Sequence, residues 1–279
     1  MQSTDRSFIS FLTDFGPDAA AAICRGVMLG IARDAQIIDI SHSVRKYAIR
    51  DGAYLLWISL SWLPVGVHVG VVDPGVGTAR RPIGLLTARG DVLIGPDNGL
   101  LTPGARVLGG AVEARVLENR AWMLPNISST FHGRDIFSPM AAHVATGGSF
   151  AEVGPEVDLA SVVDIDFPEA VAADGELTTS IVYIASFGNL HLAGGGGDFA
   201  RAFGAPEAGE RFAVELEGLD GAPGHVEEAP YVRTFGETKV GTAMLYEDSF
   251  GRLGYADNQG DAAKRLGARL DQRIRIRRG

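Results

Sequence analysis

The sequence predicts an α/β N-terminal domain with a mostly parallel sheet, followed by a small C-terminal antiparallel β-barrel domain. In the first half, short apolar runs alternate with helical stretches, whereas the apolar runs of the second half are separated by turn residues. Of the 279 residues, 46% are hydrophobic and 21% are charged, which allows a large core. We place the N-terminal domain at residues 1–165 and the C-terminal domain at residues 174–279.

The first half is predicted to form strands where apolar and β-branched residues follow one another, at 8–12, 37–40, 65–72 and 92–94. Helices are predicted between them at 19–32, which is rich in alanine, and at 51–60. This alternation favours a mostly parallel sheet that is buried on both faces. Polar residues follow several of these strands, at the edge where open α/β sheets bind ligands.

The second half has four short apolar runs, at 181–185, 211–216, 242–246 and 273–276, which suit a small antiparallel barrel or sandwich. The stretch 164–175 is expected to be a linker. We expect the glycine run 194–197 to form a flexible hairpin loop. The alternation of arginine and isoleucine over 273–277 is typical of an edge strand with solvated arginines.

Charge and targeting signals narrow the class of protein. The net charge of −9 argues against sequence-independent nucleic-acid binding, which needs a basic surface. The single cysteine, Cys24, is expected to be a buried small hydrophobe. The start has no basic stretch followed by an apolar one, and no run of about 20 apolar residues exists. We therefore expect a cytoplasmic protein without a nucleic-acid or membrane partner.

Carboxylates and imidazoles lie near several predicted strand ends, and such side chains can bind one or two divalent ions. They are Asp14, Asp39, His42, Asp73, Asp97, His132 and Asp135. Their spacing is not diagnostic, because an aspartate after a strand is also a common turn or helix cap. A metal-dependent hydrolase is therefore an open alternative at this point.

Three segments carry a more specific pattern: 72–80 (VDPGVGTAR), 96–101 (PDNGLL) and 130–135 (TFHGRD). Together with 12–16 (LTDFG), 186–189 (SFGN), 249–251 (SFG) and 258–260 (NQG), they resemble the S-adenosylmethionine (SAM) hydroxide adenosyltransferases, hydrolytic relatives of fluorinase and chlorinase. The resemblance runs essentially end to end. It implies an α/β domain followed by a β-barrel, and a homotrimer with active sites between one subunit's N-terminal domain and its neighbour's C-terminal domain.

The resemblance also implies the reaction. Asp73, Arg80 and His132 match the Asp-Arg-His set of the hydrolases, which the halogenases replace. The fluorinase insertion has no room between Arg80 and Gly95, so water is favoured over halide as the nucleophile. The implied activity is hydrolysis of SAM to adenosine and L-methionine by in-line attack of an activated water at the ribose 5′ carbon. No cofactor and no metal is implied, since SAM is the substrate.

The family pattern further implies a set of substrate-binding residues. Asp14 would hold the ribose hydroxyls, and Asp18 would lie near the methionine end. Tyr47 and Phe131 would wall the ribose and the 5′ carbon. The adenine and the remaining methionine contacts would come from the second domain, from Phe187, Asn189, Phe235, Ser249 and Gln259.

Three positions depart from the pattern. Ala185 stands where relatives have an aspartate that grips the substrate's ammonium, and Gly254 and Asp257 also replace more usual residues. A protein that binds adenosine or SAM without turnover is therefore a second alternative. Retention of Asp73, Arg80 and His132 argues against it.

Overall fold

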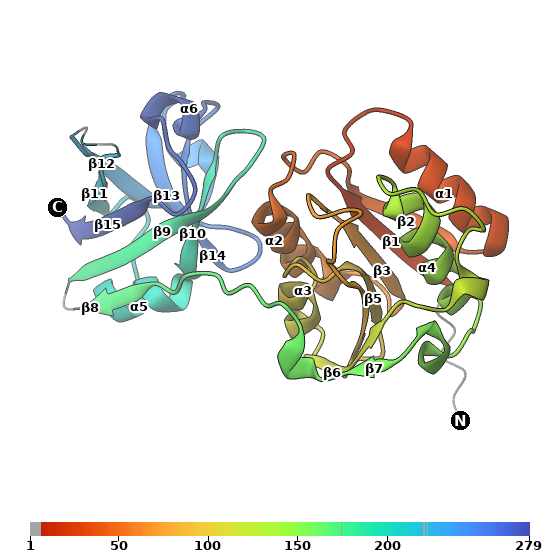
Figure 1. Cartoon of the computed structure of the whole chain (residues 1–279). Coiled ribbons are helices and arrows are strands. Elements are labelled where there is room, and N and C mark those ends of the chain that lie inside the picture. Colours follow the sequence, from red (N-terminus) through yellow and green to blue (C-terminus); the bar gives the residue numbers. More distant parts are fainter. Residues whose placement is uncertain (1–6, 174, 220, 222) are drawn as a thin grey trace. The chain divides into compact units, whose positions relative to one another are not determined.

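The chain folds as two units, Met1–Asp166 and Phe167–Gly279, and each has its own sheet (Figure 1). The structure, a computed structural model, describes residues 7–173, 175–219, 221 and 223–279. The predicted fold class is confirmed for both units: the first is α/β with a mostly parallel sheet, and the second is a closed, mostly antiparallel barrel.

The first unit is built around a 7-stranded sheet in the order β2-β1-β3-β5-β4-β6-β7. Pairings among β2, β1, β3 and β5 are parallel, and those that join β4, β6 and β7 are antiparallel. The strands are β1 (Phe8–Thr13), β2 (Gln36–Ser41), β3 (Val67–Val71), β4 (Pro82–Thr87), β5 (Val92–Pro96), β6 (Ala111–Val116) and β7 (Glu156–Val157). Strands β1, β3 and β5 are buried along their whole length, as expected of central parallel strands.

Helices cover both faces of this sheet (Figure 1). Helix α1 (Ala20–Ile31) packs with α4 (Ser138–Ala145) on one face, while α2 (Ile49–Ser59) packs with α3 (Thr102–Val107) on the other. In α1 the buried residues Ala21, Cys24 and Met28 recur at helical spacing, so one stripe of the helix joins the core. Short helical turns complete the unit: η1 (Leu60–Trp62), η2 (Arg120–Trp122), η4 (Phe150–Val153), η5 (Leu159–Ser161) and the π-helix η3 (Gly133–Phe137).

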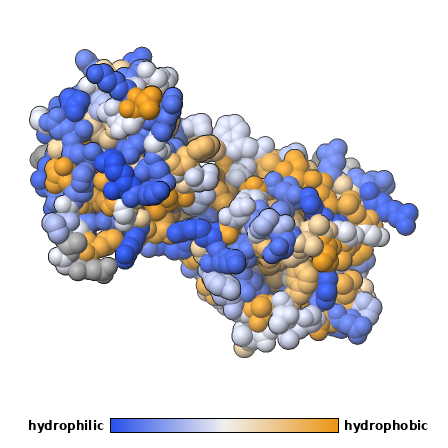
Figure 2. Space-filling model, turned by 90° about the horizontal axis from the view of Figure 1, so that it is seen from above, coloured by the Kyte–Doolittle hydropathy of each residue, from blue (hydrophilic) through white to orange (hydrophobic). Residues whose placement is uncertain are grey.

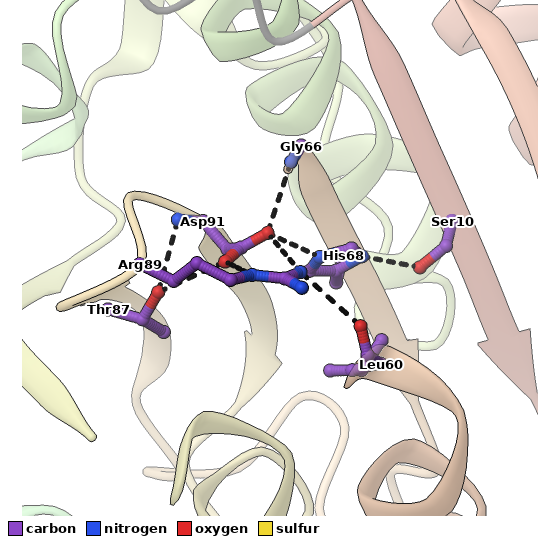
Figure 3. A network of polar contacts seen from close by, with 7 residues as sticks. All are labelled: Ser10, Leu60, Gly66, His68, Thr87, Arg89 and Asp91. Atoms are coloured by element: carbon purple, nitrogen blue, oxygen red, sulfur yellow. Dashed lines mark hydrogen bonds and ion pairs between the residues drawn. The ribbon is translucent and has the colours of Figure 1, made fainter. Parts of the chain in front are cut away.

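A largely buried polar network joins β1, β3 and the turn before β5 in the first unit (Figure 3). His68 on β3 bonds Ser10 on β1 at 2.8 Å and Asp91, before β5, at 3.0 Å. Arg89 donates to both Asp91 oxygens, at 2.7 and 2.9 Å. Burial alone would raise the pKa of Asp91, but the hydrogen bonds from His68 and Arg89 lower it far below its usual range. Ser10, His68 and Asp91 are 0% exposed, so this serine–histidine–aspartate set is structural.

The second unit is a ring of seven strands, β9-β10-β14-β13-β12-β11-β15, which closes because β10 also pairs with β9. Strand β8 pairs with the first residues of β9. The one parallel pairing among these described strands joins β12 and β13. The elements are β8 (Val171–Ala173), β9 (Glu176–Ile184), β10 (Leu190–Gly195), α5 (Gly196–Phe203), β11 (Arg211–Leu216), β12 (His225–Val232), η6 (Phe235–Glu237), β13 (Ala243–Glu247), β14 (Arg252–Asp257), α6 (Ala262–Leu266) and β15 (Arg273–Arg278).

The glycine run 194–197 is not the flexible hairpin loop that the sequence predicts. It ends β10 and begins α5, and Asp198 Oδ2 accepts from Gly195 N at 2.8 Å at this junction. A Cβ on Gly195 would overlap the Gly251 carbonyl oxygen, and one on Gly196 would overlap the Glu247 carboxylate. Glycine is needed here for close approach of two chain segments, and a flexible loop does not form.

Two further expectations for the second half are wrong. Strand β15 is not an edge strand, because closure of the ring places it between β11 and β9. Its alternation is as predicted, with Ile274 and Ile276 buried and Arg277 paired to Glu176 at 2.6 Å. The expected linker 164–175 contains strand β8, which pairs with β9.

The surface of both units mixes polar and apolar side chains on the face shown in Figure 2. Large exposed hydrophobic residues include Ile23 and Ile38 in the first unit and Val226 in the second. Among the residues described, no helix is both long and apolar enough to cross a lipid bilayer. Cys24 is fully buried, as the sequence predicts.

Candidate active site

Polar loops follow the carboxyl ends of the parallel strands β1 and β3, as the strand pattern predicts. The turn after β1 carries Asp14, and its carboxylate Oδ2 accepts a hydrogen bond from the backbone N of Tyr47 at 2.9 Å. Tyr47 has a φ of 66°, a left-handed conformation that is strained for a bulky residue, and its side chain is 70% exposed. Asp14 is therefore held in place by a backbone donor, and the Tyr47 ring is left in solvent.

Asp73, Arg80 and His132 meet in the first unit, although Arg80 and His132 are 52 residues apart in the sequence. Arg80 Nε donates to Asp73 Oδ1 at 3.1 Å, and Arg80 Nη2 donates to Asp73 Oδ2 and, at 3.2 Å, to His132 Nδ1. The side chains of Arg80 and Asp73 are only 8% and 5% exposed. The structure thus brings all three predicted catalytic residues into one connected cluster.

The hydrogen bonds of this cluster fix the protonation of His132. A guanidinium can only donate, so Nδ1 accepts and the proton of the neutral ring is on Nε2. Burial lowers the pKa of His132, and the positive charge of Arg80 lowers it further. His132 is therefore neutral at pH 7, with Nε2 as a donor.

One donor of the cluster has no protein partner. Arg80 Nη1 is buried and makes no hydrogen bond with any residue that the structure describes. A buried unpaired N–H is costly, typically by about 1–3 kcal/mol, and such a group indicates a place for a ligand or a water oxygen. The cluster thus offers an open donor beside a carboxylate and a neutral imidazole.

Close packing holds the two loops of the cluster together. The Phe137 ring lies 5.4 Å from Arg80 Cζ and stacks on the guanidinium. Gly77 has a φ of 75° and lies against Ser129, so that a Cβ there would overlap the Ser129 carbonyl oxygen. These two contacts restrict the conformation of the loop between Asp73 and Arg80.

The remaining predicted residues of the first unit differ in their surroundings. Phe131 is half-buried and packs edge-to-face on Phe15, with ring centroids 5.8 Å apart. Arg134 also lies over the Phe131 ring, 5.0 Å from its centroid. Asp18 is exposed. Phe15 thus links the Asp14 turn to the segment that carries His132.

Most of the acidic residues considered as metal ligands are already paired with arginines. Asp39 pairs with Arg25, Asp97 with Arg81, and Asp135 with Arg134. Within the described ranges, no three histidine, cysteine or acidic side chains gather as a metal site would require. The donor set that the sequence suggested is used for ion pairs, so the metal-hydrolase interpretation is not favoured.

In the second unit the predicted substrate residues lie on loops and strand ends of the barrel. Phe187 is 78% exposed in the turn between β9 and β10. Asn189 follows in this turn, and Tyr246 packs on Phe235 with ring centroids 5.0 Å apart. Ser249 and Gln259 are both exposed, on the turn between β13 and β14 and after β14. Phe235 and Tyr246 therefore form an aromatic pair, whereas the Phe187 ring is exposed.

Comparison with known proteins identifies the family. The SAM hydroxide adenosyltransferase N-terminal domain matches residues 9–154, and the C-terminal domain of the same family matches residues 179–275. The chain belongs to the SAM hydroxide adenosyltransferase family. An (R)-S-adenosyl-L-methionine hydrolase of Salinispora tropica is 38% identical over 98% of both chains, and one of Thermus thermophilus is 34% identical over 96% of this chain and 98% of that protein.

Two further comparisons give lower sequence identities. A fluorinase of Actinopolyspora mzabensis is 25% identical over 99% of both chains. The crystal structure of an uncharacterized conserved protein from Thermotoga maritima superimposes with a TM-score of 0.87 at 32% identity, covering 97% of this chain and all of that one. In the chain described here, β4 and β5 are joined by a tight hairpin turn. The turn is closed by a hydrogen bond from Thr87 N to Asp91 O at 2.9 Å. This is the segment in which the sequence leaves no room for the fluorinase insertion.

The three departures from the SAM hydroxide adenosyltransferase pattern have different structural settings. Gly254 lies opposite Tyr246 on the neighbouring strand, and a Cβ there would overlap the tyrosine ring. Asp257 is nearly buried and takes two hydrogen bonds from Arg265, each of 2.7 Å. Ala185 opens the turn to Asn189 and accepts from Gly188 N at 2.8 Å. The first two changes are accommodated by local packing, and the third leaves a position without charge.

Several residues of the site have no clear signal in the sequence. Phe137 follows His132 by five positions, and only the π-helix η3 turns it under Arg80. Tyr246 lies inside the apolar strand β13, where its sequence neighbours do not distinguish it from a core residue.

Proposed function

We propose that this protein hydrolyses S-adenosyl-L-methionine to adenosine and L-methionine. The observation that carries the proposal is the Asp73–Arg80–His132 cluster, with its open Arg80 Nη1 donor. The full-length similarity to proteins named (R)-S-adenosyl-L-methionine hydrolase supports the choice of substrate. The name of these relatives specifies one epimer at sulfur, so the assay should include both epimers of SAM.

The reaction is a displacement at the ribose 5′ carbon. A water oxygen forms the new bond to this carbon, the carbon–sulfur bond breaks, and its electron pair stays on the sulfur of methionine. Because the leaving group is a neutral thioether, no general acid is needed. The enzyme must hold the water in line with the breaking bond, and such positioning can lower a barrier by about 7–11 kcal/mol.

The cluster suits a water of hydroxide character. Arg80 Nη1 and His132 Nε2 are donors for the water oxygen, and they stabilise the negative charge that develops on it. The Asp73 carboxylate is the acceptor for the water's proton, since His132 Nδ1 is occupied by Arg80. The proton then leaves to solvent. In this scheme His132 orients the water and does not take its proton.

The charge balance of the cluster fits a cationic substrate. Arg80 alone would repel the sulfonium, but its double hydrogen bond to Asp73 makes the pair close to neutral. The low exposure of both side chains strengthens their interaction with the reacting atoms. We propose that Asp73 therefore acts twice, as proton acceptor and as counter-charge for Arg80.

Substrate binding is proposed to combine both units of the chain in an assembly. Asp14 holds the ribose hydroxyls, Tyr47 and Phe131 flank the ribose, and Asp18 lies near the methionine end. The adenine and the rest of methionine are held by the second unit, through Phe187, Asn189, Phe235, Ser249 and Gln259. We propose a homotrimer with active sites between subunits, in the cytoplasm. A fully active monomer in sedimentation analysis would refute this assembly.

The experiment that tests the function is adenosine release from each SAM epimer by the purified protein, followed by chromatography. We expect adenosine and methionine in equal amounts, with turnover unchanged by EDTA, because no metal or cofactor takes part. Chloride and fluoride should yield no halogenated nucleoside. SAM binding without product would support the non-catalytic alternative, and loss of turnover in EDTA with recovery on adding a divalent ion would support a metal-dependent hydrolase.

A further inference from the structure

The turn that carries Asp14 is anchored at both ends by His42, a residue that the proposed reaction does not use. His42 Nδ1 lies 2.8 Å from Thr13 Oγ1, and the Thr13 hydroxyl in turn accepts from Phe15 N at 3.2 Å. The backbone oxygen of His42 accepts from Gly16 N at 2.7 Å. Asp14 therefore lies inside a loop whose first and last residues are both bound to His42.

A shift in register between β1 and β2 places Thr13 opposite His42. Strands β1 and β2 pair regularly as far as Phe11 and Asp39, but Leu12 then pairs with Ser41, so that Ile40 is passed over. Without this bulge, Thr13 would be opposite Ser41. With it, Thr13 is level with His42. Bulges of this kind commonly redirect a side chain beside a functional site.

The His42 ring is itself held firmly. Its side chain is 15% exposed, its Nε2 lies 3.1 Å from Asp39 Oδ1, and Asp39 also pairs with Arg25 at 2.5 Å. The geometry of this Nε2–Asp39 contact does not make a hydrogen bond. The Phe11 ring packs edge-on at 4.9 Å between centroids. Both ring nitrogens already face protein groups, which leaves neither open to a metal ion.

We infer that His42 is a positioning residue: through the Thr13 hydroxyl it fixes the turn that presents the Asp14 carboxylate to the ribose of the nucleoside. This inference rests on the proposed function, because it assumes that a nucleoside binds at Asp14. The role is confined to binding. Asp14 does not touch the 5′ carbon, so misplacing it weakens substrate affinity more than it slows the reaction.

Two substitutions of His42 distinguish the contribution of its Nδ1 from that of its Nε2. The amide of His42→Asn reaches the position of Nδ1 and keeps the bond to Thr13, whereas that of His42→Gln reaches the position of Nε2 and loses it. Both keep the backbone bond to Gly16. One lost hydrogen bond weakens binding by roughly 3- to 10-fold. We expect this rise in KM for SAM and in Kd for adenosine in His42→Gln, little change in His42→Asn, and a kcat within about twofold in both.

Two substitutions of Thr13 test the same hydrogen bond from its other partner. Thr13→Val removes the hydroxyl and should raise KM as His42→Gln does, while Thr13→Ser should behave as the wild type. The double variant Thr13→Val/His42→Gln should be no worse than either single one, because both remove the same bond. A general loss of folding would lower kcat and the melting temperature in all variants and leave KM unchanged, and that result would overturn the inference.

Adenosine affinity, measured by calorimetry, keeps the inference separate from the proposed function. If the wild type binds adenosine but does not hydrolyse SAM, the proposed function fails and the His42 variants still report on nucleoside binding. If the wild type binds and hydrolyses normally and His42→Gln binds adenosine as tightly as His42→Asn, the inference alone is wrong.

Discussion

The two units present their site residues in opposite ways. In the first unit, Asp73, Arg80 and His132 are bonded to one another and mostly buried. In the second unit, Phe187 is 78% exposed and Ser249 and Gln259 lie on the surface. Groups that stabilise developing charge must be fixed in advance, whereas aromatic groups that stack on a base can remain open until it arrives. Substitutions in the Asp73–Arg80–His132 cluster should therefore affect rate, and those of the exposed residues of the second unit should affect affinity.

The largest effect is expected from Arg80→Lys. A lysine keeps the positive charge but cannot bond both Asp73 oxygens and His132 Nδ1 while leaving a further donor for water. We expect kcat to fall roughly 10²- to 10⁴-fold with a small change in KM. Arg106→Lys, in the exposed ion pair with Asp164, is the matched control and should keep full activity. A rise in KM alone would mean that the cluster binds substrate and does not act on the reaction.

The next effect is expected from Phe187→Ala. Stacking of a base on an aromatic ring contributes about 1–3 kcal/mol, so KM should rise about tenfold or more while kcat changes less. The ring is exposed, and the melting temperature should stay the same. Trp62→Ala, a similarly exposed ring in the first unit, is the control. Equal KM values for both variants would contradict an adenine-stacking role for Phe187.

A smaller gain is expected from Ala185→Asp. A carboxylate here would meet the substrate's ammonium, and KM for SAM should fall by up to about tenfold for each 1.4 kcal/mol recovered. Adenosine lacks this ammonium, so its Kd should not change. An unchanged KM for SAM would indicate that Asp18 already supplies the charge. A collapse in rate at constant affinity would indicate distortion of the Gly188 turn.

The smallest effect concerns pH. Burial and the Arg80 charge lower the pKa of His132 below its usual 6.5. Protonation would place two cations in contact, so activity should decline as pH falls through this lowered pKa and not before. The midpoint of the acid limb should lie below pH 6.5, and removal of the positive charge in Arg80→Ala should raise the pKa of His132 in an NMR titration. A midpoint above 6.5 would mean that His132 does not control this limb.

Features that depend on local residue patterns, such as the buried strands, could be predicted from the sequence. Features that depend on closure of the barrel or on helical register could not. Apolar runs located β1, β3 and β5, because buried parallel strands are apolar along their length. The position of β15 inside the ring was not predictable, since alternating arginine and isoleucine looks the same at an edge and in a closed barrel. The close packing at Gly195 and Gly196 has no local signal in the sequence, because the neighbours that exclude a Cβ, Gly251 and Glu247, come from another part of the chain.

The candidate site shows the same division. Asp73, Arg80 and His132 were found from motifs, but their shared hydrogen bonds and the unpaired Arg80 Nη1 required coordinates. Phe137 was missed because a π-helix breaks the usual spacing of side chains along a helix. The Thr13–His42 contact depends on a one-residue bulge, which no residue pattern in β2 predicts.

The burial of Cys24 gives this chain a built-in reporter of unfolding. Cys24 is the one cysteine in the sequence, it is 0% exposed in the core of the first unit, and burial raises the pKa of its thiol to about 11. A thiol in this state does not react with alkylating reagents at neutral pH. The rate of alkylation of the native protein therefore measures how often the α/β unit opens, while opening of the barrel leaves no label.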